Sequence, residues 1–371
     1  MDRKQHDVVI IGAGIIGVSV AYFLAREGYD VCVVDKNVVG QESTGRCAGN
    51  IGQSHRPPAD LPIVMRAVEI WKKLSESSDL DFEYRQHGNL RLAVNEEHAQ
   101  SLKEMVEREQ KLGIDCRFIS KEETRFIVPH VTDMYLGSVY TPSDGSAEPY
   151  LACWAMAREA KRSGAVIYEH VEVTGIDIEK GKITGVATAN GRISCRMAVN
   201  TAGAWSASVG AMAGINIPAE VRLSHLIVTE PLPKFLTPVL STDFYGYFRQ
   251  TLSGNVLIGY SAKPVGGYNY RVTYEAIKTA ARRAAIIIPR LREASIIRAF
   301  TGFTTWTSDN LPIVGPAKEV EGLYLACAFC GIGFADGPAI GQLVAELVMH
   351  GKTSLPIDAY RPDRFKQSRE G

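Results

Sequence analysis

Three glycines near the start of the chain have the spacing of a nucleotide-binding loop. Gly12, Gly14 and Gly17 form the pattern G-x-G-x-x-G directly after the apolar run Val8–Ile11. In such a loop the first glycine permits a tight turn, the second lets backbone approach a pyrophosphate, and the third lets a helix pack closely on a strand. Asp35, twenty-one residues after Gly14, can accept hydrogen bonds from a ribose. This combination predicts a bound dinucleotide.

The elements around these residues must hold them at the carboxyl edge of a parallel sheet. Val8–Ile11 and Val31–Val34 are short apolar runs typical of buried parallel strands, and Ile15–Arg26 between them is helical and ends before Gly28. The uncharged stretch 8–25 is also long enough to suggest a transmembrane helix or a signal peptide. Its three glycines and the acidic residues on both sides favour the dinucleotide site instead.

The composition excludes several classes of partner. The 371 residues carry 41 basic and 41 acidic side chains, so no charge excess points to nucleic acid or to an anionic membrane. The seven cysteines are irregularly spaced and no cleavable signal is visible, which predicts reduced thiols in a cytoplasmic protein. Cys327 and Cys330 form a C-x-x-C pair. No second pair exists to complete a metal site, so we expect these two thiols to be packing residues.

The middle of the chain alternates short strands with turns. Lys180-Gly181 and Asn190-Gly191 are hairpin signals that separate expected strands at 171–178, 183–189 and 192–199.

A different pattern follows from residue 220 to residue 299. Alternating strands are expected at 225–230, 244–250 and 256–260, with a helix at 273–287 behind them. These predict an antiparallel sheet with one covered face, inserted into the first unit.

Further motifs in a fixed order carry a family resemblance. With the N-terminal glycines, the chain resembles the flavin-dependent amine oxidoreductases typified by D-amino acid oxidase, glycine oxidase and sarcosine oxidase. The segments that carry this resemblance are Thr44–Gly49, Asn200–Trp205, Gly302–Asp309, Leu311–Gly315 and Gly331–Phe334. Tyr247–Gln250 followed by Gly254–Gly259 looks closest to the catalytic β subunits of heteromeric enzymes that oxidise sarcosine, proline, D-hydroxyproline or opines.

The resemblance implies the fold. We expect an α/β chain, α+β overall, in which a Rossmann-like FAD-binding domain carries an inserted antiparallel-sheet substrate domain. The FAD-binding domain would comprise residues 1–85, 145–220 and 300–371, and the substrate domain residues 86–144 and 221–299.

The resemblance also implies one extended FAD, bound without a covalent link because no cysteine or histidine stands at the family's attachment positions. Pro338 is expected to open a helix whose N-terminus stabilises negative charge on the reduced flavin. Heterotetrameric sarcosine oxidase attaches a second flavin, FMN, through a histidine near Ser146–Pro149. That histidine is absent here, and FMN at an interface with a partner subunit stays open. The residues expected at the FAD are Gly12, Gly14, Ile15, Ile16, Gly17, Asp35, Lys36, Ser43, Thr44, Arg46, Cys47, Ala48, Gly49, Val173, Thr201, Ala202, Gly203, Trp205, Gly331, Ile332, Gly333 and Phe334.

Two departures from the family pattern bear on the substrate. Thr304 stands where simple amino acid oxidases carry an arginine for the substrate carboxylate. Ala335 stands where monomeric sarcosine oxidases carry a lysine that serves the reaction with oxygen. We therefore expect Arg249 to hold the carboxylate, because it shares a strand face by period two with Tyr245 and Tyr247.

The expected function is oxidation of a secondary amine or amino acid to the imine, by hydride transfer to flavin N5, in the catalytic subunit of a heteromeric dehydrogenase. The site would comprise Arg249, Tyr245, Tyr247, Thr304 and His55. His225 is a further candidate, although an isolated histidine is more often an ordinary hydrogen-bonded residue. Three alternatives stay open: a flavin-loaded electron-transfer subunit, a stand-alone D-amino acid oxidase, and an NAD-dependent dehydrogenase, which would not explain the turn at Gly331.

Overall fold

A six-stranded sheet forms the half of the molecule that contains the glycine loop. The computed structural model describes residues 5–243, 245–260 and 267–365. Five of its strands, from β19 to β8, run parallel, and β18 runs antiparallel at the edge. In spatial order the strands are β18 (Ile313–Pro316), β19 (Leu323–Cys327), β12 (Met197–Asn200), β1 (Val8–Ile11), β2 (Val31–Val34) and β8 (Val166–Tyr168).

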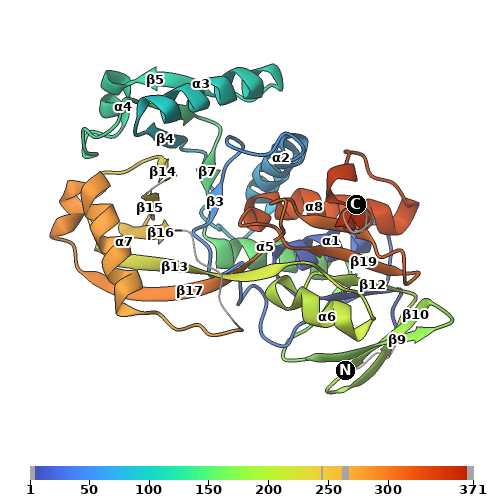
Figure 1. Ribbon diagram of the computed structural model, residues 1–371. Helices are drawn as coiled ribbons and strands as arrows, with labels where there is room; N and C mark the ends of the chain where they lie inside the picture. Colours follow the sequence, from blue (N-terminus) through green and yellow to red (C-terminus); the bar gives the residue numbers. More distant parts are fainter. Residues whose placement is uncertain (1–4, 244, 261–266, 366–371) are drawn as a thin grey trace.

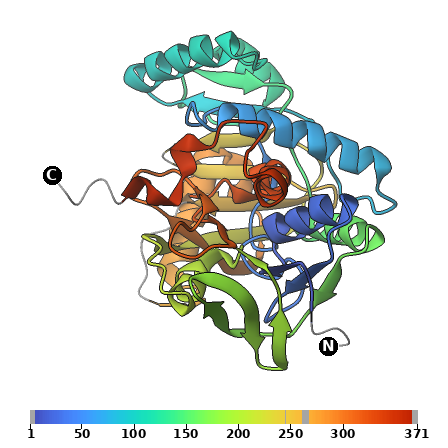
Figure 2. The same cartoon turned by 90° about the vertical axis from the view of Figure 1, so that its right-hand side faces the viewer.

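Both faces of this sheet are covered, which explains why its strands are apolar throughout. One face packs on α1 (Ile15–Arg26), α5 (Pro149–Arg162) and α8 (Gly333–His350), as Figure 2 shows. The other face packs on α6 (Ser206–Met212) and a three-stranded antiparallel sheet. The strands of that small sheet are β9 (Val173–Glu179), β10 (Lys182–Thr188) and β11 (Gly191–Ser194).

An eight-stranded sheet forms the second half. All its neighbouring pairs are antiparallel except β14 with β4. In order its strands are β17 (Ile296–Trp306), β13 (Glu220–Pro231), β16 (Asn255–Tyr260), β15 (Gly246–Gln250), β14 (Val239–Thr242), β4 (Asn89–Ala93), β6 (Gly137–Thr141) and β5 (Arg117–Ser120).

Helices cover this sheet at two places. α7 (Tyr274–Ile287) packs against β13, β15 and β16, while α3 (Glu96–Lys111) and α4 (Lys121–Ile127) pack at the β4–β6 end. The β4–β6 end lies farthest from the β9–β10 hairpin in both views (Figures 1 and 2). The long pair β13 and β17 runs from α7 towards α6 and so connects the two halves (Figure 1).

Short elements complete the connection between the halves. α2 (Leu61–Ser77) packs on α8, and β3 (Asn50–Ile51) pairs with β7 (Gly145–Ser146). Four 3-10 turns are η1 (Gly203–Trp205), η2 (Pro289–Arg292), η3 (Asp358–Tyr360) and η4 (Pro362–Phe365). No helix in the described part of the chain is long and apolar enough to cross a bilayer.

The fold class expected from the sequence is confirmed, and the first helix has the expected bounds. Ser120 and Glu123 form a reciprocal capping box at α4, and Gly351 ends α8 in the left-handed region. The strand β17 carries residues 300–306, which the sequence assigned to the cofactor domain, into the eight-stranded sheet. The division into domains otherwise stays a prediction.

Two expected elements were wrong in detail. The single strand expected at 192–199 is two strands, β11 and β12, because the chain crosses from the small sheet to the six-stranded sheet between them. Pro338 does not open the last helix, which already begins at Gly333. Close packing on α1 explains the difference: a Cβ added to Gly337 would lie 2.8 Å from Cγ2 of Ile15, so tertiary contact keeps this stretch helical despite the proline.

The approach of α1 to its strand gives a first prediction. A Cβ on Gly17 would lie 1.9 Å from the Gly12 carbonyl oxygen and 2.7 Å from Oγ1 of Thr201. Gly17→Ala should therefore lower stability by about 1–3 kcal/mol or more, with loss of bound cofactor, because the Gly12 backbone cannot move aside. Gly175→Ala in β9 is the matched control, since its added Cβ would make an ordinary 3.5 Å contact. Thermal unfolding of the two variants measures the difference in stability. Equal melting temperatures of Gly17→Ala and Gly175→Ala would contradict the packing argument.

Candidate active site

A cavity of about 260 Å³ lies at the carboxyl ends of β1, β2 and β12. Most of the residues expected at the FAD line it. They are Gly12, Gly14, Ile15, Ile16, Asp35, Lys36, Ser43, Thr44, Cys47, Val173, Thr201, Ala202, Gly203, Trp205, Gly331, Gly333 and Phe334. Gly17 does not line the cavity but supports it through the close approach of α1.

The backbone of the glycine loop is held open towards this cavity. Gly12 has φ of 111°, and a Cβ there would lie 2.6 Å from the carbonyl oxygen of Thr201. The Thr201 hydroxyl donates to the carbonyls of Ile11 and Gly12 at 2.9 and 3.0 Å. Gly14 has no side chain that could cap α1, and the Ile15 amide donates to the Thr44 hydroxyl at 3.1 Å. The next amides of the first turn have no partner within the helix and can serve as an anion site.

Asp35 is fixed at the end of β2. Its Oδ2 accepts a hydrogen bond from the Ala13 amide and its Oδ1 accepts one from the Asn37 amide, both at 2.7 Å. Burial raises the pKa of the Asp35 carboxyl, and these two amide hydrogen bonds oppose that effect. Each carboxylate oxygen can accept a second hydrogen bond, so Asp35 still fits a ribose hydroxyl.

A second cavity, of about 530 Å³, opens between the eight-stranded sheet and the start of α8. Arg46, Ala48, Gly49 and Ile332, which the sequence placed at the cofactor, line this cavity and not the first. The two cavities meet at a shared wall that consists of Ser43, Cys47, Phe303, Thr304, Cys330, Gly331 and Phe334. Three of the expected substrate residues, His55, Tyr247 and Thr304, also line the second cavity.

The structure places Arg249 outside the wall of the second cavity. Its side chain does not line this cavity, and only 4% of the residue is exposed. Its Nη1 donates to the Ala147 carbonyl at 3.0 Å and to the Ser146 hydroxyl at 3.3 Å. Arg249 therefore connects β15 to the segment that contains β7. This segment covers the face of β15 on which Arg249 lies. The expectation that its guanidinium looks into the substrate cavity was wrong.

Tyr245 is also displaced from the expected site. β15 begins at Gly246, so Tyr245 belongs to the preceding turn and packs against the α7 side of the sheet with Phe248. Tyr247 remains in the cavity wall, where its ring lies flat over Gly259 of the neighbouring strand: a Cβ on Gly259 would be 2.1 Å from its Cζ. Burial raises the pKa of the Tyr247 phenol.

The two candidate histidines have different surroundings. His55 has φ of 63°, its amide donates to Oε1 of Glu109 at 2.8 Å, and its Nε2 lies 3.9 Å from Oδ2 of Asp243. Burial, and then the nearby Arg91 charge, lower the pKa of His55 to about 4, so the imidazole is neutral near neutral pH. His225 lies on β13 and lines neither cavity.

A buried ionic cluster supports the start of α8. Nη1 of Arg56 lies 3.4 Å from Oδ2 of Asp60 and 3.5 Å from Oδ2 of Asp336, and the Tyr360 hydroxyl donates to Asp60 at 2.9 Å. Burial raises the pKa of both carboxyls, that of Asp336 well above its ordinary value. Nε1 of Trp71 donates to the Ala335 carbonyl at 2.8 Å in the same turn. No periodic pattern in the sequence indicates this cluster.

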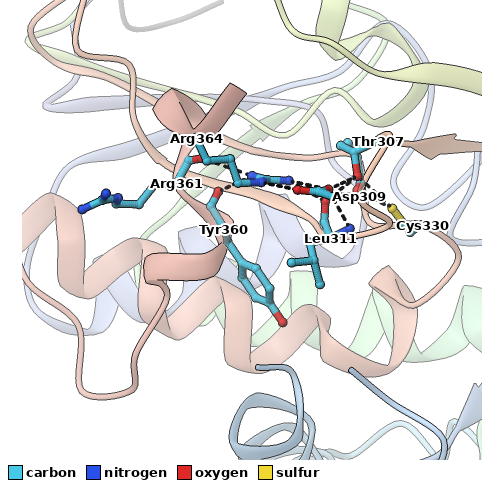
Figure 3. A network of polar contacts seen from close by, with 8 residues as sticks. Thr307, Asp309, Leu311, Cys330, Tyr360, Arg361 and Arg364 are labelled. Carbon is cyan, nitrogen blue, oxygen red and sulfur yellow. Dashed lines mark hydrogen bonds and ion pairs between the residues drawn. The ribbon is translucent and has the colours of Figure 1, made fainter. Parts of the chain in front are cut away.

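A second polar network fixes the turn before α8 (Figure 3). Nε and Nη2 of Arg364 donate to the Asp309 carboxylate at 2.8 and 3.1 Å. Asp309 also accepts a 2.8 Å hydrogen bond from the Thr307 hydroxyl. The Thr307 hydroxyl lies 3.6 Å from the sulfur of Cys330, which belongs to the shared wall. Cys330 and Cys327 are both free thiols. Cys327 ends β19 and packs in the core between the six-stranded sheet, α6 and the small sheet.

Comparison with known proteins assigns the family. Residues 7–347 match the family model described as FAD dependent oxidoreductase (DAO). The chain belongs to the FAD-dependent oxidoreductase family. Its sequence is 28% identical to human mitochondrial sarcosine dehydrogenase over 98% of this chain, but it spans only 42% of that protein. It is 27% identical to sarcosine oxidase subunit beta of Rhodobacter capsulatus, over 98% of this chain and 90% of that one. The structure of L-proline dehydrogenase from P. horikoshii superimposes with a TM-score of 0.95, at 35% identity and 99% coverage of both chains.

FAD is therefore the cofactor of this family member, and the residues of the first cavity fit it. The glycine loop and the start of α1 can hold the pyrophosphate, Asp35 the ribose, and the apolar Val171, Val173 and Val209 an adenine. The sequence missed other residues that line this cavity, among them Glu42, Met212 and Phe303. They reach it from a loop, from α6 and from β17, elements whose arrangement no short motif encodes.

The position of Asp35 gives a second prediction. Asp35→Ala should weaken FAD binding by about ten- to a hundredfold, because a hydrogen bond to a charged group contributes roughly 1.5–3 kcal/mol. Asp177→Ala, which removes the partner of Arg192 in the small sheet, is the control and should leave FAD binding unchanged. Equilibrium titration of the apoprotein with FAD measures both. An unchanged dissociation constant in Asp35→Ala would remove Asp35 from the cofactor site.

Proposed function

We propose that this protein oxidises a secondary amine or an amino acid to the imine, as the catalytic subunit of a heteromeric dehydrogenase. The main support for the proposal is that two cavities lie side by side and share a wall. The first fits FAD, and the second is polar and large enough for a small substrate. The substrate classes are those of the resemblance: sarcosine, proline, D-hydroxyproline and opines. The similarity to a sarcosine oxidase subunit beta supports the heteromeric assembly.

The chain's own residues would contribute orientation and exclusion of water. FAD, held non-covalently, supplies the hydride acceptor. The N-terminus of α8, which begins at Gly333 in the wall of the first cavity, can stabilise negative charge on the flavin. His55, neutral near neutral pH, and the Tyr247 hydroxyl can form hydrogen bonds with the substrate in the second cavity. A strong protein base is not required for hydride transfer from a neutral amine.

The reaction itself gives the third prediction. The purified protein should show flavin absorbance, and an amine or amino acid substrate should bleach it under anaerobic conditions. We would screen glycine, sarcosine, D-alanine, both prolines, D-hydroxyproline and an opine, with the matched carboxylic acids that lack nitrogen as controls. Bleaching by one of the amines supports the proposal. A flavin that dithionite reduces but that no amine in the screen reduces would support an electron-transfer subunit instead.

The cavity wall beside α8 gives the fourth prediction. Ala335, buried at 3% exposure, lines the second cavity where a lysine would favour reaction with oxygen. The substrate-reduced protein should therefore react with oxygen more slowly than with a dye or a quinone. Stopped-flow reoxidation in air-saturated buffer measures this, and Ala335→Lys should not slow the reaction with oxygen. Reoxidation by oxygen as fast as turnover would show a stand-alone oxidase.

A further inference from the structure

Arginine side chains dominate the charge of the second cavity. Its lining carries five arginines and one acidic residue, Asp243. The arginines are Arg46, Arg56, Arg91, Arg222 and Arg283. A cavity of this composition attracts an anionic group, and a carboxylate that enters it needs a donor pair in a suitable geometry.

Most of these arginines are already engaged. Arg46 donates to the carbonyls of Gln41 and Thr301 at 3.2 Å each. Arg56 holds the buried Asp60–Asp336 cluster, and Arg91 is paired with Asp243. Arg283 also has an interaction partner. The contacts of these guanidinium groups are therefore mainly with other residues of the protein.

Arg222 differs because both terminal nitrogens of its guanidinium are available to a ligand. Its Nε donates to Oε2 of Glu220 at 3.1 Å, while its Cζ lies 4.7 Å from the centre of the Trp306 ring. Its two terminal nitrogens make no hydrogen bond to any residue that the structure describes. The side chain is 30% exposed, so a ligand in the cavity can reach it. The stacked ring and the single ion pair fix the plane of the guanidinium and leave the Nη1/Nη2 edge open.

The register of β13 and β17 places Arg222 beside the shared wall. Arg222 pairs directly with Thr304, and Ser224 pairs with Gly302. On β13 the alternate residues Arg222, Ser224 and Leu226 line the cavity. On β17 the alternate residues Gly302, Thr304 and Trp306 do so, together with Phe303. Directly paired residues have Cβ atoms about 5 Å apart. Since Thr304 belongs to the wall between the two cavities, the Arg222 guanidinium lies within side-chain reach of the flavin side.

We propose that Arg222 is the residue that binds the substrate carboxylate, through its Nη1/Nη2 edge. The inference rests on the proposed function, in that the second cavity holds an amine substrate that also bears a carboxylate. Trp306 and Glu220 are the positioning residues for this guanidinium. Arg249, with its hydrogen bonds to Ser146 and Ala147, has a structural role.

A binding experiment separates this assignment from turnover. The probes are pyrrole-2-carboxylate and its neutral match pyrrole-2-carboxamide, titrated into the FAD-loaded protein by calorimetry and by the perturbation of flavin absorbance. The variants are Arg222→Ala and Arg222→Lys. Arg298→Ala is the matched control, because Arg298 on β17 is also stacked on a ring, that of Phe300 at 5.4 Å, but is exposed and lies outside the cavity.

The wild-type protein and Arg298→Ala should bind the carboxylate at least about tenfold more tightly than the carboxamide. Arg222→Ala should lose about ten- to a hundredfold in affinity for the carboxylate and little for the carboxamide. Arg222→Lys should lose most of the same preference, since an ammonium cannot form the bidentate pair. The flavin spectrum and melting temperature confirm that each variant is folded.

Two outcomes would overturn the proposal. One is a wild-type protein that binds both probes equally. The other is an Arg222→Ala variant that is less stable but keeps its preference for the carboxylate, which would show a purely structural arginine. Neither outcome depends on turnover. The anaerobic bleaching screen tests the reaction separately, so failure of the proposed function and failure of the Arg222 assignment give different results.

Discussion

The geometry of this site depends on one guanidinium enclosed in the protein. Arg56 lies between the carboxylates of Asp60 and Asp336 with only 9% of its side chain exposed. Asp336 belongs to the first turn of α8, which borders the first cavity, whereas Arg56 stands in the loop that lines the second cavity. Loss of one partner from such a cluster leaves a buried charge uncompensated and costs about 3–5 kcal/mol. This cluster therefore helps to hold the two cavities in register.

Burial limits how much negative charge this cluster can carry. Two carboxyls share one cation in a site that water scarcely reaches, and the pKa of each is raised. The pair therefore retains a proton more readily than isolated aspartates would. A nearly neutral cluster does not oppose negative charge on the flavin side of α8, which a pair of ionised aspartates would do.

The cofactor half of the site could be predicted from the sequence because its signals are local. Gly12, Gly14 and Asp35 lie within one strand–helix–strand unit, where spacing alone places them. The substrate half depends on contacts between distant segments. The face of β15 that carries Arg249 is covered by β7, about a hundred residues earlier, and no period-two pattern within 245–249 shows that cover. Likewise, only the pairing of β13 with β17 brings Arg222 opposite Thr304.

The pairing of Arg222 with Thr304 has a consequence for how relatives of this protein diverge. Side chains on two directly paired strand positions occupy neighbouring space, so a cation attached to either strand reaches the same part of the cavity. In evolution the cation can therefore be exchanged between the strands while the bound anion stays in place. Counted column by column in an alignment, such an exchange is recorded as the loss of a functional residue, although the binding site persists in three dimensions.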